Sequence, residues 1–434
     1  MTIINPAKIY STLGNPNSLI PLAGKDIAAT AGMTAGSYFT GKEEGEDRLI
    51  DEFGTEFIWL GGLPFFKWVY DNTVFKALGL DAKFDARNLK DKDVFEKIKE
   101  HAPTKTIKNN IEKIAKKEKL FKNAVATKFV VSTALTVASY MGLTKFKQNY
   151  TEKKIRENLI AEYSAKKAKE TKEENINKTN KEQASKNVAF KGIGPMVESF
   201  AFSPVKNMWI LDGFITEERL RESRSPQEFI GYAIKEASTL LFMYCVGDKI
   251  QEALEKRAKE KYNKTIGLDA RVLEDNFLKK AFEDGSIQKS LDEFKTANKS
   301  SADLYEFIHK NPDNLIVKTA KKSDLISVVK DTEFIDTRKY IDLKDIEGID
   351  TKLTELYKQY KEAIAKGDSS EKFFNGVKKL KRHSILTNIG TCIFALGVVT
   401  PAIMLGKRLV GKDDSEFETK KEIRKQLIKE GLIS

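Results

Sequence analysis

The chain has 434 residues, of which 41 % are hydrophobic, so it has room for two or three ordinary domains and is not intrinsically disordered. Its net charge of +12 is a thin excess over abundant charges of both signs, which favours anionic lipid or nucleic acid only weakly. No stripe of Lys/Arg interleaved with aromatic residues occurs, so we expect anionic lipid headgroups, and no nucleic acid, as partners. Cys245 and Cys392 both lie in apolar runs, which argues against a disulfide framework; we expect no cofactor and no metal centre.

Helical periodicity dominates the chain. Proline is scarce, long Lys/Glu/Ala/Leu segments follow the helical repeat, and alternating strand patterns are hard to find. We therefore expect an all-α fold. The N-terminal segment, residues 1–47, lacks the charged start and apolar run of a cleavable signal, and we expect it to be retained.

Four apolar segments follow one another along the chain. Residues 57–70 are interrupted by Gly61, Gly62 and Pro64, so we expect a shallow, re-entrant or interfacial helix, or a core helix of a soluble domain. The same choice applies to residues 229–246, which carry two charges. Residues 123–143 contain one charge, near an end, and are long enough to cross a bilayer.

The strongest membrane signal is the uncharged run at residues 384–406. At about 1.5 Å per residue it can cross a hydrocarbon core of about 30 Å, and basic groups flank both ends. Pro401 predicts a kink in this helix. Within residues 123–143, small residues recur at every fourth position and predict a helix-packing stripe. The stripe consists of Ala134, Ala138 and Gly142.

Two polar stretches separate these segments. Residues 161–187 have almost no apolar content, which predicts a solvated helix or a flexible linker. Residues 290–375 read as several short amphipathic helices and predict a soluble inserted domain, through which protein partners could bind.

Landmarks repeat in the same order in the two halves of the chain. Glu52-Phe53 matches Glu228-Phe229, Gly79–Ala82 matches Gly267–Ala270, and Thr151–Ile160 resembles Glu418–Ile428, with Ile155-Arg156 matching Ile423-Arg424. The offset between matches grows by 80 residues (268 − 188) between the second and third pair, which fits an insertion at 290–375. We predict a duplicated helical hairpin unit. The N-terminus, the linker and the C-terminus would then lie on one side of the membrane and the insertion on the other.

The predicted organisation follows from these segments. It comprises 1–47; a first repeat at 48–160; a charged linker at 161–187; the start of a second repeat at 188–289; an insertion at 290–375; and the end of the second repeat at 376–434.

Charges inside the weak apolar segments are the main functional hint, because charge is costly in lipid. They predict an intramembrane polar site, although the same residues could mark helix ends at the interface. The site would consist of Lys67, Asp71, Lys235, Glu236 and Asp248. His101, His309 and His383 are far apart in sequence and are interpreted as surface residues.

No catalytic motif is apparent, so we expect a multi-pass membrane protein that is not an enzyme and serves as a structural or interaction component. A transporter or channel with a polar site between two parallel repeats is the second interpretation. A soluble or peripheral helical protein whose apolar runs form its core is the third. The sequence does not determine the oligomeric state.

Overall fold

The computed structural model describes residues 6–15, 18–167, 200, 202–223, 226–297, 300–410 and 418–433. These residues are overwhelmingly helical, and the one β pairing among them is an isolated bridge between Val328 and Ile335. The prediction of an all-α fold is confirmed. Most of the predicted linker, residues 168–187, lies outside the described residues, while its first seven residues continue a helix.

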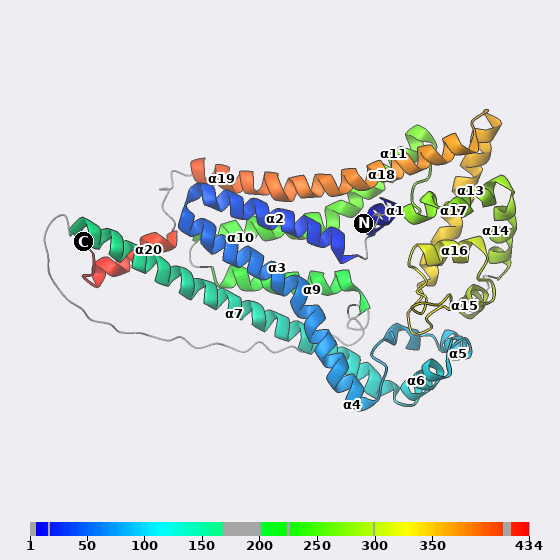
Figure 1. The fold of residues 1–434 in the computed structure, drawn as a ribbon, viewed down its shortest axis with the longest axis horizontal. Helices are drawn as coiled ribbons and strands as arrows, with labels where there is room; N and C mark the ends of the chain where they lie inside the picture. The colour runs from blue at the N-terminus through cyan, green and yellow to red at the C-terminus, as the bar shows by residue number, and fades with distance from the viewer. Residues whose placement is uncertain are drawn as a thin grey trace.

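Long helices form a bundle and short helices form a head at one end of it (Figure 1). The bundle contains α2 (Leu19–Thr40), α3 (Lys42–Tyr70), α7 (Glu118–Lys167), α9 (Pro204–Arg221), α10 (Pro226–Leu241), α18 (Ser370–Phe394) and α19 (Thr400–Val410). Three π-helical turns extend or join these helices: η1 (Asp71–Phe75), η3 (Phe242–Val246) and η4 (Ala395–Val399).

The remaining helices are short or lie at the bundle's ends. They are α1 (Pro6–Leu13), α4 (Lys76–Leu78), η2 (Ala86–Leu89), α5 (Lys92–Glu100), α6 (Lys105–Lys116), α11 (Gly247–Tyr262), α12 (Ala270–Glu274), α13 (Asn276–Glu283), α14 (Ser286–Ala297), α15 (Ser301–Lys310), α16 (Leu315–Lys322), α17 (Leu343–Ala365) and α20 (Glu418–Lys429).

The head has one hydrophobic core built from two distant parts of the chain, residues 75–125 and 258–377. The loop after α4 packs on the loop before α17: the Asp85 amide donates to the Arg338 carbonyl at 2.9 Å, and Arg87 lies over the Tyr340 ring at 4.4 Å. The predicted insertion at 290–375 therefore shares its core with the first half of the chain. Its boundaries stay predictions.

The repeated GLDA stretch adopts two different conformations. Gly79 ends α4 with φ of 65°, whereas Asp269 caps α12 and pairs with Arg271 at 3.2 Å. Asp85 makes the same cap and the same pair, with Arg87 at 2.7 Å. Residues 84–87 therefore have the same local structure as residues 268–271, whereas residues 79–82 do not. The duplication itself stays a prediction.

Helix α3 runs unbroken through Gly61, Gly62 and Pro64, so the predicted interruption of residues 57–70 is wrong. The glycine that contacts α7 serves packing, because a Cβ at Gly62 would lie 3.0 Å from the Thr136 methyl group. Pro64 is exposed on the outside of the bundle.

The helix departs from regular α geometry at the π-helical turn η4, just before Pro401, and the kink predicted at Pro401 stays a prediction. Proline cannot donate a backbone hydrogen bond, and the Thr400 hydroxyl donates to the Ala395 carbonyl at 3.1 Å. The helix therefore continues into α19.

Three helical stretches of the described chain are long and apolar enough to cross a membrane by length and composition. They are Glu118–Ala165, Glu228–Tyr262 and Ser370–Gly406. They include the predicted segments 123–143, 229–246 and 384–406 in full. Residues 57–70 are not among them.

Two bundle helices, α2 and α9, are not among the predicted apolar segments. Each carries charged residues that face inward and lower its hydropathy. Helix α2 runs along the bundle before α3, so α2 begins at the opposite end of the bundle from the start of α3 (Figure 1). Helix α1 therefore lies at the head, where the Ser11 hydroxyl donates to Asp269 at 2.9 Å. The described N-terminal residues thus lie at the head end, and the predicted position opposite the insertion is wrong.

The second half of the bundle runs in the same order as the first. Helix α3 leads into the head and α7 returns antiparallel to it; α10 leads into the head and α18 and α19 return antiparallel to it (Figure 1). Helix α7 ends far from the head, packed against α20, whereas α9 begins at the head end (Figure 1).

Candidate polar site in the helix bundle

A cluster of buried charges joins four bundle helices at the end far from the head. Helix α3 places three charges on one face because their spacing of three and four residues matches the helical repeat. Helices α7, α9 and α10 supply the rest. This charge cluster consists of Arg48, Asp51, Glu52, Lys147, Arg219, Lys235 and Glu236.

Arg219 is the centre of the charge cluster, with a side chain only 2 % exposed. Its guanidinium pairs with Glu236, and its Nη2 lies 3.5 Å from Asp51 Oδ2 and 3.6 Å from Glu52 Oε2. Nε donates to the Tyr140 hydroxyl at 2.8 Å. A planar cation with five donors can satisfy several carboxylates at once, which a lysine cannot.

Two lysines complete the charge cluster. Lys147 lies 3.5 Å from Asp51 Oδ1, and Lys235 lies 3.1 Å from both Glu52 Oε2 and Glu236 Oε1. The Tyr232 hydroxyl accepts from Lys147 and donates to Asp51, both at 3.1 Å. Four cations thus face three carboxylates, so each buried charge has an opposite charge nearby, as burial requires.

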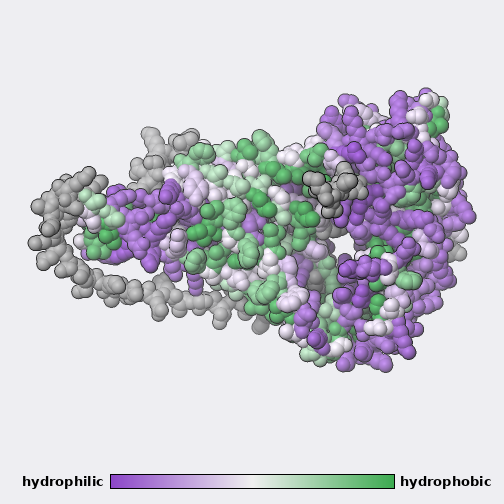
Figure 2. All heavy atoms as spheres, in the orientation of Figure 1, coloured by the Kyte–Doolittle hydropathy of each residue, from purple (hydrophilic) through white to green (hydrophobic). Residues whose placement is uncertain are grey.

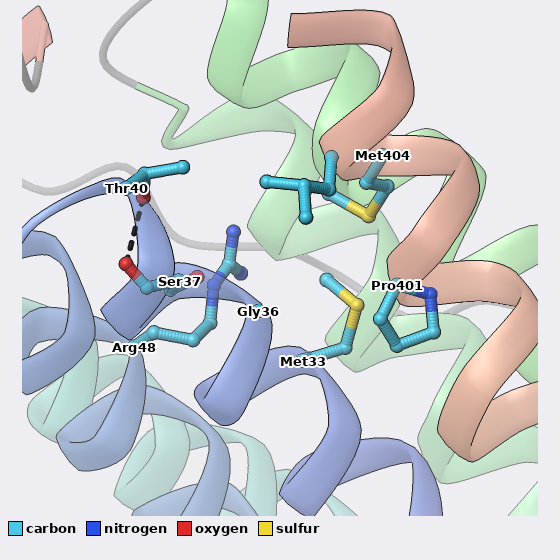
Figure 3. Close-up of a pocket in the computed structure, with 8 residues that line it drawn as sticks. Met33, Gly36, Ser37, Thr40, Arg48, Pro401 and Met404 are labelled. Atoms are coloured by element: carbon cyan, nitrogen blue, oxygen red, sulfur yellow. Dashed lines mark hydrogen bonds between the residues drawn. The ribbon is translucent and has the colours of Figure 1, made fainter. Parts of the chain in front are cut away.

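Arg48 connects the charge cluster to an open pocket (Figure 3). The guanidinium donates to Glu52 at 3.4 Å and projects between α2 and α19. Side chains from these two helices and α3 line the pocket, which has hydroxyl groups near Arg48 and apolar groups opposite. The lining residues are Met33, Gly36, Ser37, Thr40, Arg48, Pro401, Met404 and Leu405.

A second polar group lies closer to the head. Thr30 of α2 donates to Glu56 of α3 at 3.1 Å, and Asp26 lies within hydrogen-bonding reach of Glu56. Tyr244 of η3 donates to Asp212 of α9. The polar interior therefore extends from the Arg48 pocket toward the middle of the bundle.

The five residues of the predicted site are not brought together. Lys235 and Glu236 lie in the charge cluster, but Asp71 pairs with Lys128 at 2.5 Å, beside Lys67 and near the head. Asp248 is exposed on α11. Helix geometry explains the correction: at about 1.5 Å per residue, residue 67 lies about 22 Å and residue 71 about 28 Å from residue 52 along α3 and η1.

The sequence interpretation also missed functional candidates on α2, α3 and α9. Arg219, Asp51 and Glu56 were missed because they lie outside the predicted apolar segments, where a charged residue does not stand out. The available signal was polar residues at spacings of three and four along α3, which places them on one face: Arg48, Asp51, Glu52 and Glu56.

The predicted helix-packing stripe faces outward. Ala134, Ala138 and Gly142 are exposed, and a Cβ at Gly142 would meet no atom within 4 Å. The buried face of α7 is the polar one. It carries Ser132, Thr136, Tyr140, Thr144 and Lys147. The stripe therefore does not pack against another helix of the described chain, because α7 turns its hydrogen-bonding side chains toward the buried charges.

Two histidines expected to be separate surface residues stack in the head. The rings of His101 and His309 lie 4.6 Å apart with 14° between their planes, and the Nε2 atoms of both are buried. Burial, together with the nearby His101 and Lys321, lowers the pKa of His309 to about 3. In the described part of the chain, no group of three or more His, Cys, Asp or Glu residues could hold a metal ion.

No protein-family model, curated protein or solved structure matches the chain.

Proposed function

We propose that the chain is an integral membrane protein whose bundle is embedded in the bilayer. The observation that carries this proposal is the polarity of the bundle: a group of paired charges is buried inside it beside an apolar cluster, and many large apolar side chains lie on its outside. In water this arrangement would expose a large apolar surface, which is unfavourable. In a bilayer the same apolar surface would contact the hydrocarbon chains of the lipids, and the charges would face the interior of the bundle.

Figure 2 shows hydrophobic residues gathered over the bundle, between the hydrophilic head and a hydrophilic opposite end. Phe57 is 80 % exposed and Trp68 is 62 % exposed, although both lie on the central helix α3. Other exposed apolar residues belong to each candidate span. They include Val130, Val131, Leu135, Phe229, Ile230, Leu241, Ile393, Phe394, Val398 and Ile403.

Within this class we propose a transporter or channel for a small ion, with the polar interior as its path. A purely structural bundle has no need for seven buried charges, which are rare in membranes and usually mark ion pathways. The Arg48 pocket gives the charge cluster an opening, and the second polar group extends it inward. The equal order of helices in both halves supports the predicted duplication, with α3 and α10 as equivalent helices.

Membrane embedding is tested by washing membranes with high salt and then alkaline carbonate. A protein that stays in the pellet until detergent is added is embedded, and its basic flanks would contact anionic headgroups. Release by carbonate would mean that the apolar surfaces are covered in another way and would end the transport proposal.

Transport is tested in sealed proteoliposomes that contain a pH-sensitive dye, with ion gradients of known composition. We expect a flux that falls at least tenfold in Glu52→Gln, because Lys235 loses a partner. Glu252→Gln is the matched control, since Glu252 is exposed on α11 and pairs with Lys249 at 2.8 Å. Equal flux in the wild type and empty liposomes would contradict the proposal.

A structural or interaction component is the second candidate. It is favoured by the charge cluster itself, in which every ionised side chain is paired, so that the cluster could simply hold the helices in register. In that case the head, including residues 290–375, would bind a protein partner. Proteoliposomes without flux, made from protein that carbonate does not extract, would favour this candidate.

A further inference from the structure

Two similar side-chain arrangements occur in the bundle, one in each half. In the first, Asp26 and Thr30 of α2 are one turn apart, and the Thr30 hydroxyl donates to Glu56 of α3 at 3.1 Å. In the second, Asp212 and Thr216 of α9 are one turn apart, and the Thr216 hydroxyl donates to Glu236 of α10 at 3.5 Å. In both, the threonine lies on the helix just before the one that carries the glutamate.

The two arrangements differ in the charge available to the glutamate. Glu236 is paired with Arg219 and Lys235. Glu56 is buried, and in the described part of the chain its Oε2 has no hydrogen-bond donor. The group within its reach is another carboxyl, that of Asp26. Two carboxylates in contact repel each other, and a hydrogen bond between them requires a proton on one of them.

We infer that Asp26 and Glu56 form a proton-exchange site that holds one proton between their two carboxyl groups. An O–H bond forms on one carboxylate when hydronium delivers a proton, and it breaks when a water molecule accepts that proton again. The inference deepens the proposed function, since it names the proton as the ion that moves.

The charged surroundings suit reversible loading. Lys235 faces the pair from α10 and stabilises the deprotonated form, whereas Glu52, Glu236 and Asp212 face it from α3, α10 and α9 and favour protonation. Tyr244 of η3 bonds to Asp212 on the adjacent side. Charges of both signs therefore act on the proton that the pair would hold.

The position of the pair also suits transport. Along α3, Glu56 lies eight residues from Arg48 at the pocket and eleven from Lys67 near the head, or about 12 Å and about 16 Å. A proton held there is therefore near the middle of the apolar part of the bundle.

The inference is tested by infrared difference spectroscopy of the purified full-length protein during a pH titration. We expect a carbonyl band of a protonated carboxyl that appears and disappears reversibly, and that is lost in both Asp26→Asn and Glu56→Gln. Asp248→Asn is the control, because that carboxylate is exposed and should not contribute to the band. If either variant fails to fold, Thr30→Val provides a second test: it removes the hydroxyl donor to Glu56 and should move the titration midpoint upward by at least half a pH unit.

The outcomes separate the site from the transport proposal. A band that is lost in the variants, without proton flux in proteoliposomes, would support the exchange site and contradict the transporter. Flux that persists in Asp26→Asn and Glu56→Gln would overturn the assignment of the proton to this pair while leaving transport intact. A band unchanged by either substitution, or one removed by Na⁺ at constant pH, would also overturn the inference.

Discussion

Arg219 is the residue on which the bundle's interior depends, because it contacts carboxylates of α3 and α10 and the Tyr140 hydroxyl of α7. Arg219→Met leaves these carboxylates buried with fewer partners, and we expect a loss of about 3–5 kcal/mol in the free energy of unfolding. Unfolding in detergent, followed by tryptophan fluorescence, measures this loss.

Arg221→Ala is the control for that measurement. Arg221 lies on the same helix but is 42 % exposed and pairs with exposed Glu217 and Glu222. We expect a change within about 0.5 kcal/mol, as is usual for surface substitutions. Similar losses in both variants would mean that the charge cluster does not carry the stability assigned to it.

His309 makes the head sensitive to acid. Its pKa is about 3 in the folded chain, against about 6.5 for an exposed histidine, so the unfolded state binds more protons between these values. The stability it contributes is complete above pH 6.5 and falls with acidification by about 1.4 kcal/mol per pH unit. From pH 6.5 to 5 we expect a loss of about 2 kcal/mol.

Hydrogen-exchange protection of α5 and α15 measures this loss locally. His309→Phe keeps an aromatic ring against His101 but cannot titrate, so it should remove most of the pH dependence. His383→Gln should leave it unchanged, because His383 is exposed. A slope that survives in His309→Phe would assign the acid sensitivity to other groups.

At the scale of the helices, glycine determines where α2 approaches η4. A Cβ at Gly32 would lie 2.2 Å from the Gly397 carbonyl oxygen, a contact that only a backbone shift can relieve. We expect Gly32→Ala to lower the free energy of unfolding by about 1–3 kcal/mol. Thermal unfolding in detergent provides the measurement.

Gly142 offers the opposite case, because a Cβ there meets no atom within 4 Å. Gly142→Ala should raise stability by about 0.5–1 kcal/mol through the helix propensity of alanine. A destabilised Gly142→Ala together with a neutral Gly32→Ala would reverse the assignment of the packing contact.

The same contrast shows what the sequence could predict about the elements. Long uncharged runs identify α7 and α18 because mean hydropathy is independent of which side faces the neighbours. Mean hydropathy gives no information about which face of a helix is buried. The small-residue stripe of α7 was therefore assigned to packing, although the polar stripe of α7 is the buried one. Helices α2 and α9 were missed for a related reason: each carries charges that are buried against other helices, and such burial is invisible in a single segment.

Prediction of the site was limited because contacts between distant segments are not visible in the sequence of either segment. Lys235 and Glu236 could be selected because charge within an apolar run is locally visible. Their partners Glu52 and Arg219 lie in segments where charge is unremarkable, so only the three-dimensional contacts reveal them. The histidine stack is likewise a contact between residues 208 positions apart (309 − 101).

At the scale of the whole molecule, the ends of α7 and α9 provide the strictest test of a fully spanning bundle. Helix α7 ends far from the head and α9 begins near it (Figure 1), so a bilayer crossed by the entire bundle separates these two points. A peripheral protein would leave both in the same compartment. Single cysteines at exposed Glu162 and Lys206, in a chain with Cys245 and Cys392 replaced by serine, can report this directly.

We expect an impermeant thiol reagent, applied to sealed vesicles of one orientation, to label either Glu162→Cys or Lys206→Cys but not both. A third cysteine at exposed Lys366, in the turn between α17 and α18, marks the head side and should behave like Lys206→Cys. Labelling of all three from one side would contradict a complete crossing, because a bundle with both ends in the same water cannot separate two compartments. The buried charges would then be explained as a scaffold, and the Asp26 and Glu56 pair would exchange protons with one side alone.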